Sequence, residues 1–151
     1  MTMTSVDERK RLARRSLEMW ASKDRIVPEE ILAADYRNHQ EPDAAGTVAT
    51  LHLKGWKALV EEIHNAFSDF EVVVFNQLAE GDMVATRWQS MATNVGPFLG
   101  HPATGKRATW TGVQIDRFAD GKIAESWLNW DKYRMFDELG YLGQRLSEQK
   151  R

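Results

Sequence analysis

The chain has 151 residues, a formal net charge of -2 and no Cys, so we expect one domain without disulfides or thiolate chemistry. The charges are spread along the sequence, which excludes the basic footprint of a nucleic-acid-binding protein, and no run approaches the roughly 20 apolar residues that span a bilayer. With no secretory signal pattern, the sequence predicts a single cytoplasmic domain over 1–151, with its core at about 5–142. Its six Trp residues are unusual, because Trp commonly lines cores, interfaces or pockets for flat ligands.

The N-terminal part predicts helices. Residues 5–22 show an amphipathic pattern, and Ser5 with Glu8 makes a capping-box signature. The Arg-rich side of this helix is typical of a nucleic-acid or membrane surface, but a solvated face is the better interpretation because acidic residues balance it nearby. Pro28 suits the first turn of a second, short helix over 24–35.

Extended structure dominates the rest of the chain. A brief extended segment, 36–39, precedes a polar loop over 41–50, and the apolar stripe of 55–68 predicts a third helix. Period-two patterns then predict long strands over 70–78, 83–94, 109–118 and 123–131. A short helix from Lys132 begins the tail, which is expected to fray by 146.

The last two strands form a hairpin, because Asp120-Gly121 is a two-residue turn signal between them. Large apolar groups lie on both faces of this hairpin, so both faces should be covered, one by the interior and the other by helices or a partner subunit. These features predict an α+β domain in which one curved antiparallel sheet forms an open cone, with the N-terminal helices covering one face.

The chain is poor in catalytic signatures. It has no nucleophile elbow, phosphate-binding loop, dinucleotide fingerprint or zinc-protease motif. Its four His residues have no ligand spacing, so we expect no metal; His64 fits a helix surface and His101 a loop. Asp131 could be an acid or base, but its place between a strand and a helix favours an N-cap, and turn chemistry explains Asp120.

The chain resembles the SnoaL-like polyketide cyclase family in the segments ADYRNH, GDMVATRWQ, NVGPFLGHPATGKR and ADGKIAESWLNWD. That family belongs to the superfamily of nuclear transport factor 2 and ketosteroid isomerase, and the likeness runs from the first helix to about Leu142. The resemblance implies an α+β cone, a deep apolar pocket, a homodimer and no metal or organic cofactor. Family enzymes tailor polyketides: SnoaL itself closes an aromatic polyketide ring by an aldol reaction, and close relatives are thought to be hydroxylases.

The resemblance also assigns pocket positions. The family's acid/base aspartate falls on Leu128, its pocket His on Gln114 and a pocket Gln on Gly112, while the pocket Asn is retained as Asn38. Leucine cannot transfer protons, so the family's aldol mechanism is not expected to operate unchanged, and hydroxylase-like or altered chemistry is favoured.

We therefore predict a protein that takes a small, flat, apolar or aromatic molecule. The expected catalytic groups are Tyr36, Asn38 and Gln114. The expected substrate-binding residues are Trp20, Trp88, Ser90, Trp110, Ser126, Leu128 and Trp130.

Two alternatives stay open. One is a non-catalytic ligand carrier on the same fold, and the other is a purely dimeric interaction protein whose cavity is filled by side chains. A homodimer is expected in any case, because outward-facing apolar residues on the last two strands would otherwise be exposed: Val113, Ile115, Ile123 and Trp127.

Overall fold

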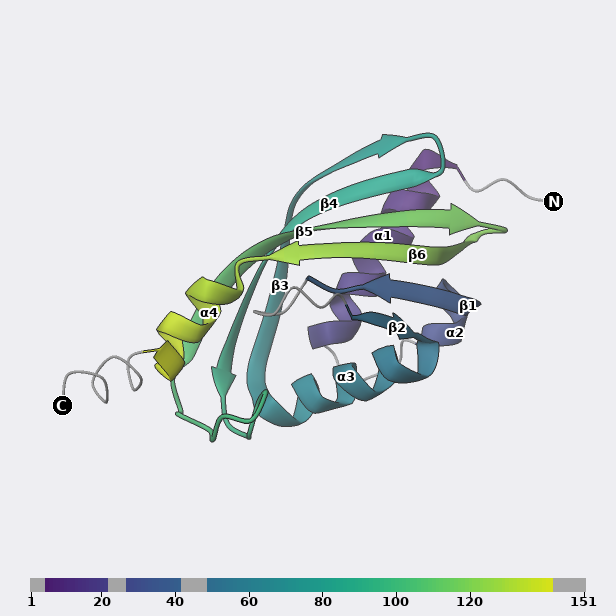
Figure 1. The fold of residues 1–151 in the computed structure, drawn as a ribbon. Helices are drawn as coiled ribbons and strands as arrows, with labels where there is room; N and C mark the ends of the chain where they lie inside the picture. Colours follow the sequence, from purple (N-terminus) through teal and green to yellow (C-terminus); the bar gives the residue numbers. More distant parts are fainter. Residues whose placement is uncertain (1–4, 22–26, 42–48, 143–151) are drawn as a thin grey trace.

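The computed structural model of the chain describes residues 5–21, 27–41 and 49–142, and it confirms the α+β class (Figure 1). The helices are α1 (Val6–Ala21), α2 (Pro28–Ile31), α3 (Leu53–Ala66) and α4 (Lys132–Glu138). The strands are β1 (Leu32–His39), β2 (Thr50–His52), β3 (Phe67–Glu80), β4 (Met83–Asn94), β5 (Arg107–Ala119) and β6 (Lys122–Trp130).

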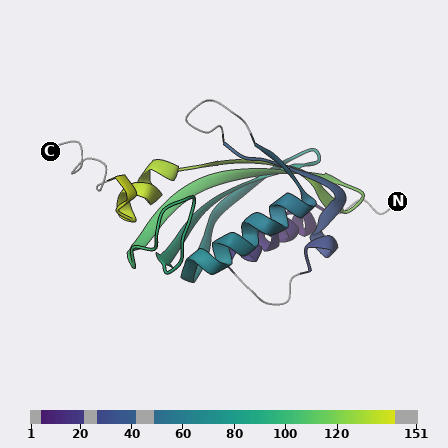
Figure 2. The same cartoon turned by 60° about the horizontal axis from the view of Figure 1, so that its bottom comes forward.

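All six strands form one curved sheet in the order β2-β1-β6-β5-β4-β3. Figure 2 shows α1 and α3 lying against its concave side, with α4 beyond one end. The pairings are antiparallel except that β1 runs parallel to β6, which corrects the expectation of a wholly antiparallel sheet. No hairpin joins β1 to β6, so turn geometry does not impose the antiparallel direction on this pair.

The predicted helices differ from the observed ones mainly at their ends, and α3 begins and ends two residues earlier than predicted. Helix α1 is close to its predicted span, and Ser5 Oγ accepts a hydrogen bond from the Glu8 backbone N–H at 3.1 Å, as capping requires. The second helix is shorter than predicted, because Leu32 already pairs with Ile123 in the sheet. Residues 24–26 of that predicted helix, most of the predicted loop over 41–50 and the tail beyond 142 lie outside the described residues.

The β5–β6 hairpin turns at Asp120 and Gly121, whose φ angles of 51° and 80° fit the predicted two-residue turn. A register shift next to this turn pairs Phe118 with Ile123. The shift rotates Ile123 into the interior, where it is fully buried, although strict alternation places it on the outer face. The outer apolar patch predicted for a dimer therefore loses Ile123.

Asn94 fixes the loop that follows β4. Its side-chain N–H group donates to the carbonyl oxygens of Ala66 (3.1 Å) and Gly96 (2.9 Å), and its oxygen accepts from the Thr104 backbone N–H (2.9 Å) and the Tyr141 hydroxyl (3.0 Å). These bonds tie the loop to α3 and to the chain after α4. Within the described ranges, no helix is long and apolar enough to cross a membrane.

Candidate functional site: a cavity on the concave side of the sheet

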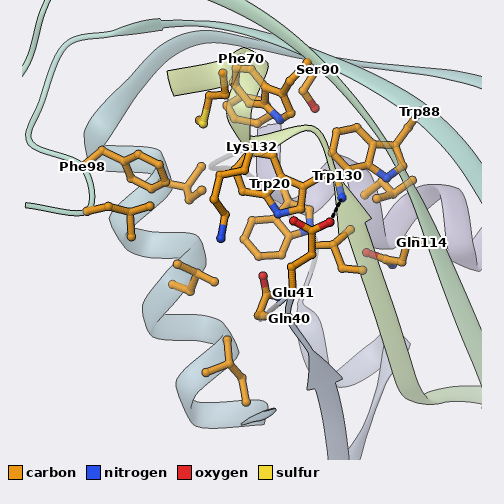
Figure 3. Close-up of a pocket in the computed structure, with 18 of the residues that line it drawn as sticks. Trp20, Gln40, Glu41, Phe70, Trp88, Ser90, Phe98, Gln114, Trp130 and Lys132 are labelled. Carbon is orange, nitrogen blue, oxygen red and sulfur yellow. Dashed lines mark hydrogen bonds between the residues drawn. The ribbon is translucent and has the colours of Figure 1, made fainter. Parts of the chain in front are cut away.

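A cavity of about 350 Å³ lies between the sheet and the helices (Figure 3). Its walls are mainly apolar and aromatic, and four Trp side chains from different elements line it: Trp20 of α1, Trp88 of β4, Trp110 of β5 and Trp130 of β6. Such a wall can bind flat aromatic rings through burial and stacking. Because the cavity is open, the alternative of an interaction protein with a filled interior is not supported.

Period-two alternation places the sheet residues of the cavity. Ser90 pairs with Trp110 across β4 and β5, and Gln114 pairs with Leu128 across β5 and β6, so these side chains share the concave face. Gly112 makes room for one of the Trp rings, because a Cβ there would lie 2.5 Å from Trp88 Cζ2 and 2.8 Å from the Asn129 carbonyl oxygen. Trp88 can therefore pack directly against the β5 backbone.

The structure brings most of the predicted site residues to the cavity. The lining includes Trp20, Trp88, Ser90, Trp110, Gln114, Leu128 and Trp130. Tyr36, Asn38 and Ser126 do not line it, although each is buried. They lie in a hydrogen-bonded chain that reaches the cavity at two lining residues, Gln114 and Gln40, and the Gln40 side-chain amide donates to Asn38 Oδ1.

That chain centres on Asp116. Asn38 Nδ2 donates to Tyr36 Oη at 2.9 Å, Tyr36 Oη donates to Ser126 Oγ at 2.9 Å, and Ser126 Oγ donates to Asp116 Oδ1 at 2.5 Å. Gln114 Nε2 donates to the same Asp116 oxygen at 2.9 Å. The Asp116 carboxyl group therefore fixes the orientation of the Gln114 side-chain amide at the cavity wall.

Asp116 is an ionisable group without a charged hydrogen-bond partner. It is fully buried, and burial raises the pKa of its carboxyl group to about 7 although Ser126 and Gln114 donate hydrogen bonds to it. Burial and the neighbouring Asp116 likewise raise the pKa of the Tyr36 hydroxyl. Asp116 was not among the site residues predicted from the sequence, although alternation along β5 puts it on the same face as Gln114 and could have identified it.

Two charged residues also line the cavity. Within the part of the chain that the structure describes, Glu41 and Lys132 are the only charged residues that line the cavity. Glu41 Oε1 accepts from the Trp130 backbone N–H at 2.8 Å and from Asn129 Nδ2 at 3.3 Å, while Lys132 Nζ lies 5.5 Å from the Trp130 ring centroid. Neither residue was singled out from the sequence, because neither belongs to a motif.

The other ionisable candidates have structural partners. The Asp131 carboxylate accepts from the Arg134 backbone N–H at 2.9 Å, which confirms its predicted N-cap role. His64 Nε2 lies 2.9 Å from the Met19 carbonyl oxygen, and His101 stacks on Tyr141 with ring centroids 4.1 Å apart.

His39 Nε2 lies 2.6 Å from Glu125 Oε2, and this hydrogen bond lowers the pKa of the Glu125 carboxyl group. Among the described residues, no group of three or more His, Asp or Glu side chains could hold a metal ion.

Comparison with known proteins agrees with the geometry. A sequence model of the SnoaL-like polyketide cyclase family matches residues 10–139. The chain belongs to the SnoaL-like polyketide cyclase family. No curated protein matches it.

Solved structures of other proteins share the fold. TsrD from Streptomyces laurentii has a TM-score of 0.78 at 23% identity, covering 91% of this chain and 98% of its own. IdmH from Streptomyces antibioticus, a proposed polyketide cyclase, has a TM-score of 0.73 at 28% identity, covering 87% and 98%. AclR from Streptomyces galilaeus, a proposed hydroxylase, has a TM-score of 0.72 at 29% identity, covering 91% and 98%. The predicted family and fold are confirmed.

Proposed function

We propose that this SnoaL-like protein is a cofactor-independent enzyme of polyketide tailoring that acts on a flat, largely apolar aromatic molecule. The observation that carries the proposal is the cavity of about 350 Å³ with four Trp side chains in its wall. IdmH and AclR, similar to this chain at 28% and 29% identity, support the same class of chemistry.

The polar groups have distinct roles in this proposal. Gln114 contacts the ligand directly and orients a carbonyl or phenol group, since it lines the cavity and its side-chain amide is held by the Asp116 carboxyl group. Tyr36, Asn38 and Ser126 are positioning residues that act on Gln114 through Asp116. Leu128 lines the cavity at the position of the family's acid, so the acid or base of this protein must lie elsewhere.

A non-catalytic ligand carrier is the second candidate function. The observation that favours it is the deep wall of the cavity, where Ser90, Gln114 and Leu128 offer no ionisable group to a ligand. Turnover of an aromatic polyketide would separate an enzyme from a carrier, which would bind the same molecule and release it unchanged.

Ligand binding can be tested before the natural substrate is known. We expect 1,8-dihydroxyanthraquinone to bind in titration calorimetry, and Leu59→Trp to weaken binding at least tenfold because Leu59 lines the cavity. Ala58→Trp is the matched control, since Ala58 is exposed on the same helix and outside the lining. Absence of binding, or equal loss in both variants, would contradict the proposal.

We also propose that the protein is a homodimer formed through the convex face of the sheet. Val73, Phe75, Val113 and Ile115 are 41%, 42%, 39% and 37% exposed on β3 and β5. Burying such a patch in a dimer removes apolar surface from water. Light scattering should give about twice 17.3 kDa, and a monomer at micromolar concentration would refute this arrangement.

A further inference from the structure

The charged groups of the cavity lie together at its mouth. Figure 3 shows Glu41 and Lys132 directed into the space beside Trp20 and Trp130. Both residues are partly exposed, in contrast to the fully enclosed Asp116. A ligand that fills the aromatic cavity would therefore meet one carboxylate and one ammonium group where it meets solvent.

Glu41 is held by one of its two carboxylate oxygens. Oε1 receives both the Trp130 backbone N–H and the Asn129 side-chain N–H, at 2.8 and 3.3 Å. No residue in the described ranges donates a hydrogen bond to Oε2. Anchoring through one oxygen fixes the group while leaving the lone pairs of the other for a proton, which is the arrangement that a general base needs.

Lys132 supplies the opposite charge. Its ammonium group lies near the face of the Trp130 ring, and it makes no ion pair with any described carboxylate. A cation that lines an apolar cavity can stabilise negative charge developing on a ligand oxygen, and this stabilisation is stronger than in bulk water.

We propose that Glu41 is the catalytic base of this cavity and that Lys132 stabilises the oxyanion formed. In this step Glu41 takes a proton from a carbon next to a ligand carbonyl group. The C–H bond breaks, its electron pair forms the C=C bond of an enolate, the carbonyl π pair moves onto oxygen, and Lys132 faces that oxygen. No oxidant or reductant is needed, and the proton held by Glu41 can return to another ligand atom.

This inference rests on the proposed function, because it requires a flat ligand in the cavity. It deepens that function by placing the missing acid/base group on the β1–β2 connection instead of at Leu128 on β6. Enolisation is the first step of both an aldol closure and a double-bond shift, so ligands with an acidic C–H beside a carbonyl form the substrate class.

A probe reaction tests the base without the natural substrate. 5-Nitrobenzisoxazole is flat and apolar, and a base that removes its ring C–H breaks the N–O bond to give coloured 2-cyano-4-nitrophenolate. We expect the protein to accelerate this opening over buffer, Glu41→Gln to lower kcat/KM at least about tenfold, and Lys132→Met to lower it by a smaller factor. Glu62→Gln, the same change at an exposed α3 position outside the lining, should leave the rate unchanged.

The outcomes are distinguishable. Unchanged anthraquinone binding with a lost probe rate in Glu41→Gln supports the assignment, and partial recovery in Glu41→Asp would show that the carboxylate itself is required. Full activity in Glu41→Gln, or no acceleration by a wild-type protein that binds the anthraquinone, would overturn it while leaving the proposed function intact. A rate that follows an ionisation near pH 7 and vanishes in Asp116→Asn would assign the base to Asp116 instead. Failure to bind the anthraquinone at all would remove the proposed function as well.

Discussion

The two carboxylates associated with the cavity, Asp116 behind it and Glu41 at its mouth, have opposite environments. Asp116 is fully buried among neutral hydrogen-bond donors, and its pKa is raised to about 7. Glu41 is partly exposed, anchored to the β6 backbone and in contact with the ligand space. Asp116, whose pKa is raised by burial, does not line the cavity and cannot touch a ligand there. A shifted pKa alone does not identify a catalytic residue, because access must accompany it.

The largest expected effect comes from Asp116→Asn. In the folded protein Asp116 has a pKa near 7 against 3.8 in an unfolded chain, so ionisation favours unfolding as pH rises from about 4 to 7. Asparagine removes this ionisation and keeps an oxygen that can accept from Ser126 and Gln114. We expect its free energy of unfolding to exceed that of the wild type by roughly 2–4 kcal/mol at pH 8, and by little at pH 4. Urea unfolding at both pH values measures the difference, and a pH-independent difference would contradict a buried, titrating Asp116.

Leu128→Asp tests whether this part of β6 forms the cavity wall. Leu128 lines the cavity and pairs with Gln114, so the new carboxyl group would face ligand space while lying close to the Asp116 chain. We expect a loss of about 2–3 kcal/mol, a raised pKa for the introduced acid and weaker binding of apolar aromatic ligands. A thermal melt lowered by more than about 15 °C would instead place Leu128 in a packed core and remove this strand from the cavity wall.

Gly112→Ala should have the smallest effect of the stability variants. Its Cβ would lie too close to the Asn129 carbonyl oxygen and to the Trp88 ring, so the aromatic wall must shift. We expect a loss of about 1–2 kcal/mol with reduced anthraquinone affinity. Gly55→Ala on α3 is the matched control, because its Cβ would meet Leu51 at an ordinary 3.5 Å and alanine favours a helix. Equal affinity in both variants would show that Trp88 does not shape the ligand site.

The periodicity of the sequence predicts which side chains share one face of a strand. Alternation placed Trp88, Trp110 and Trp130 on one face of the long strands, and the structure brings them to one cavity. It could not predict the parallel β1–β6 pair, since this contact joins distant segments without a hairpin. The inward turn of Ile123 depends on a register shift, which strict alternation does not contain.

The site residues also differ in how far the sequence could predict them. Alternation along β5 puts Asp116 on the same face as Gln114, but its importance depends on Ser126 of β6, which donates to it, and on Tyr36 of β1, which donates to Ser126. Glu41 follows β1 and contacts the end of β6, so only the tertiary fold brings it to the cavity. Motif reasoning, which starts from spacing along the chain, could not find this residue.

In this protein the mouth of the cavity carries the proposed proton transfer, and the buried hydrogen-bonded chain only positions the wall. The most direct test compares kcat/KM for 5-nitrobenzisoxazole in Glu41→Gln and Asp116→Asn, measured side by side at pH 8. We predict a loss of at least about tenfold for Glu41→Gln and of less than about threefold for Asp116→Asn. The reverse order, with Asp116→Asn inactive and Glu41→Gln near wild type, would show that Asp116 and not Glu41 is the base.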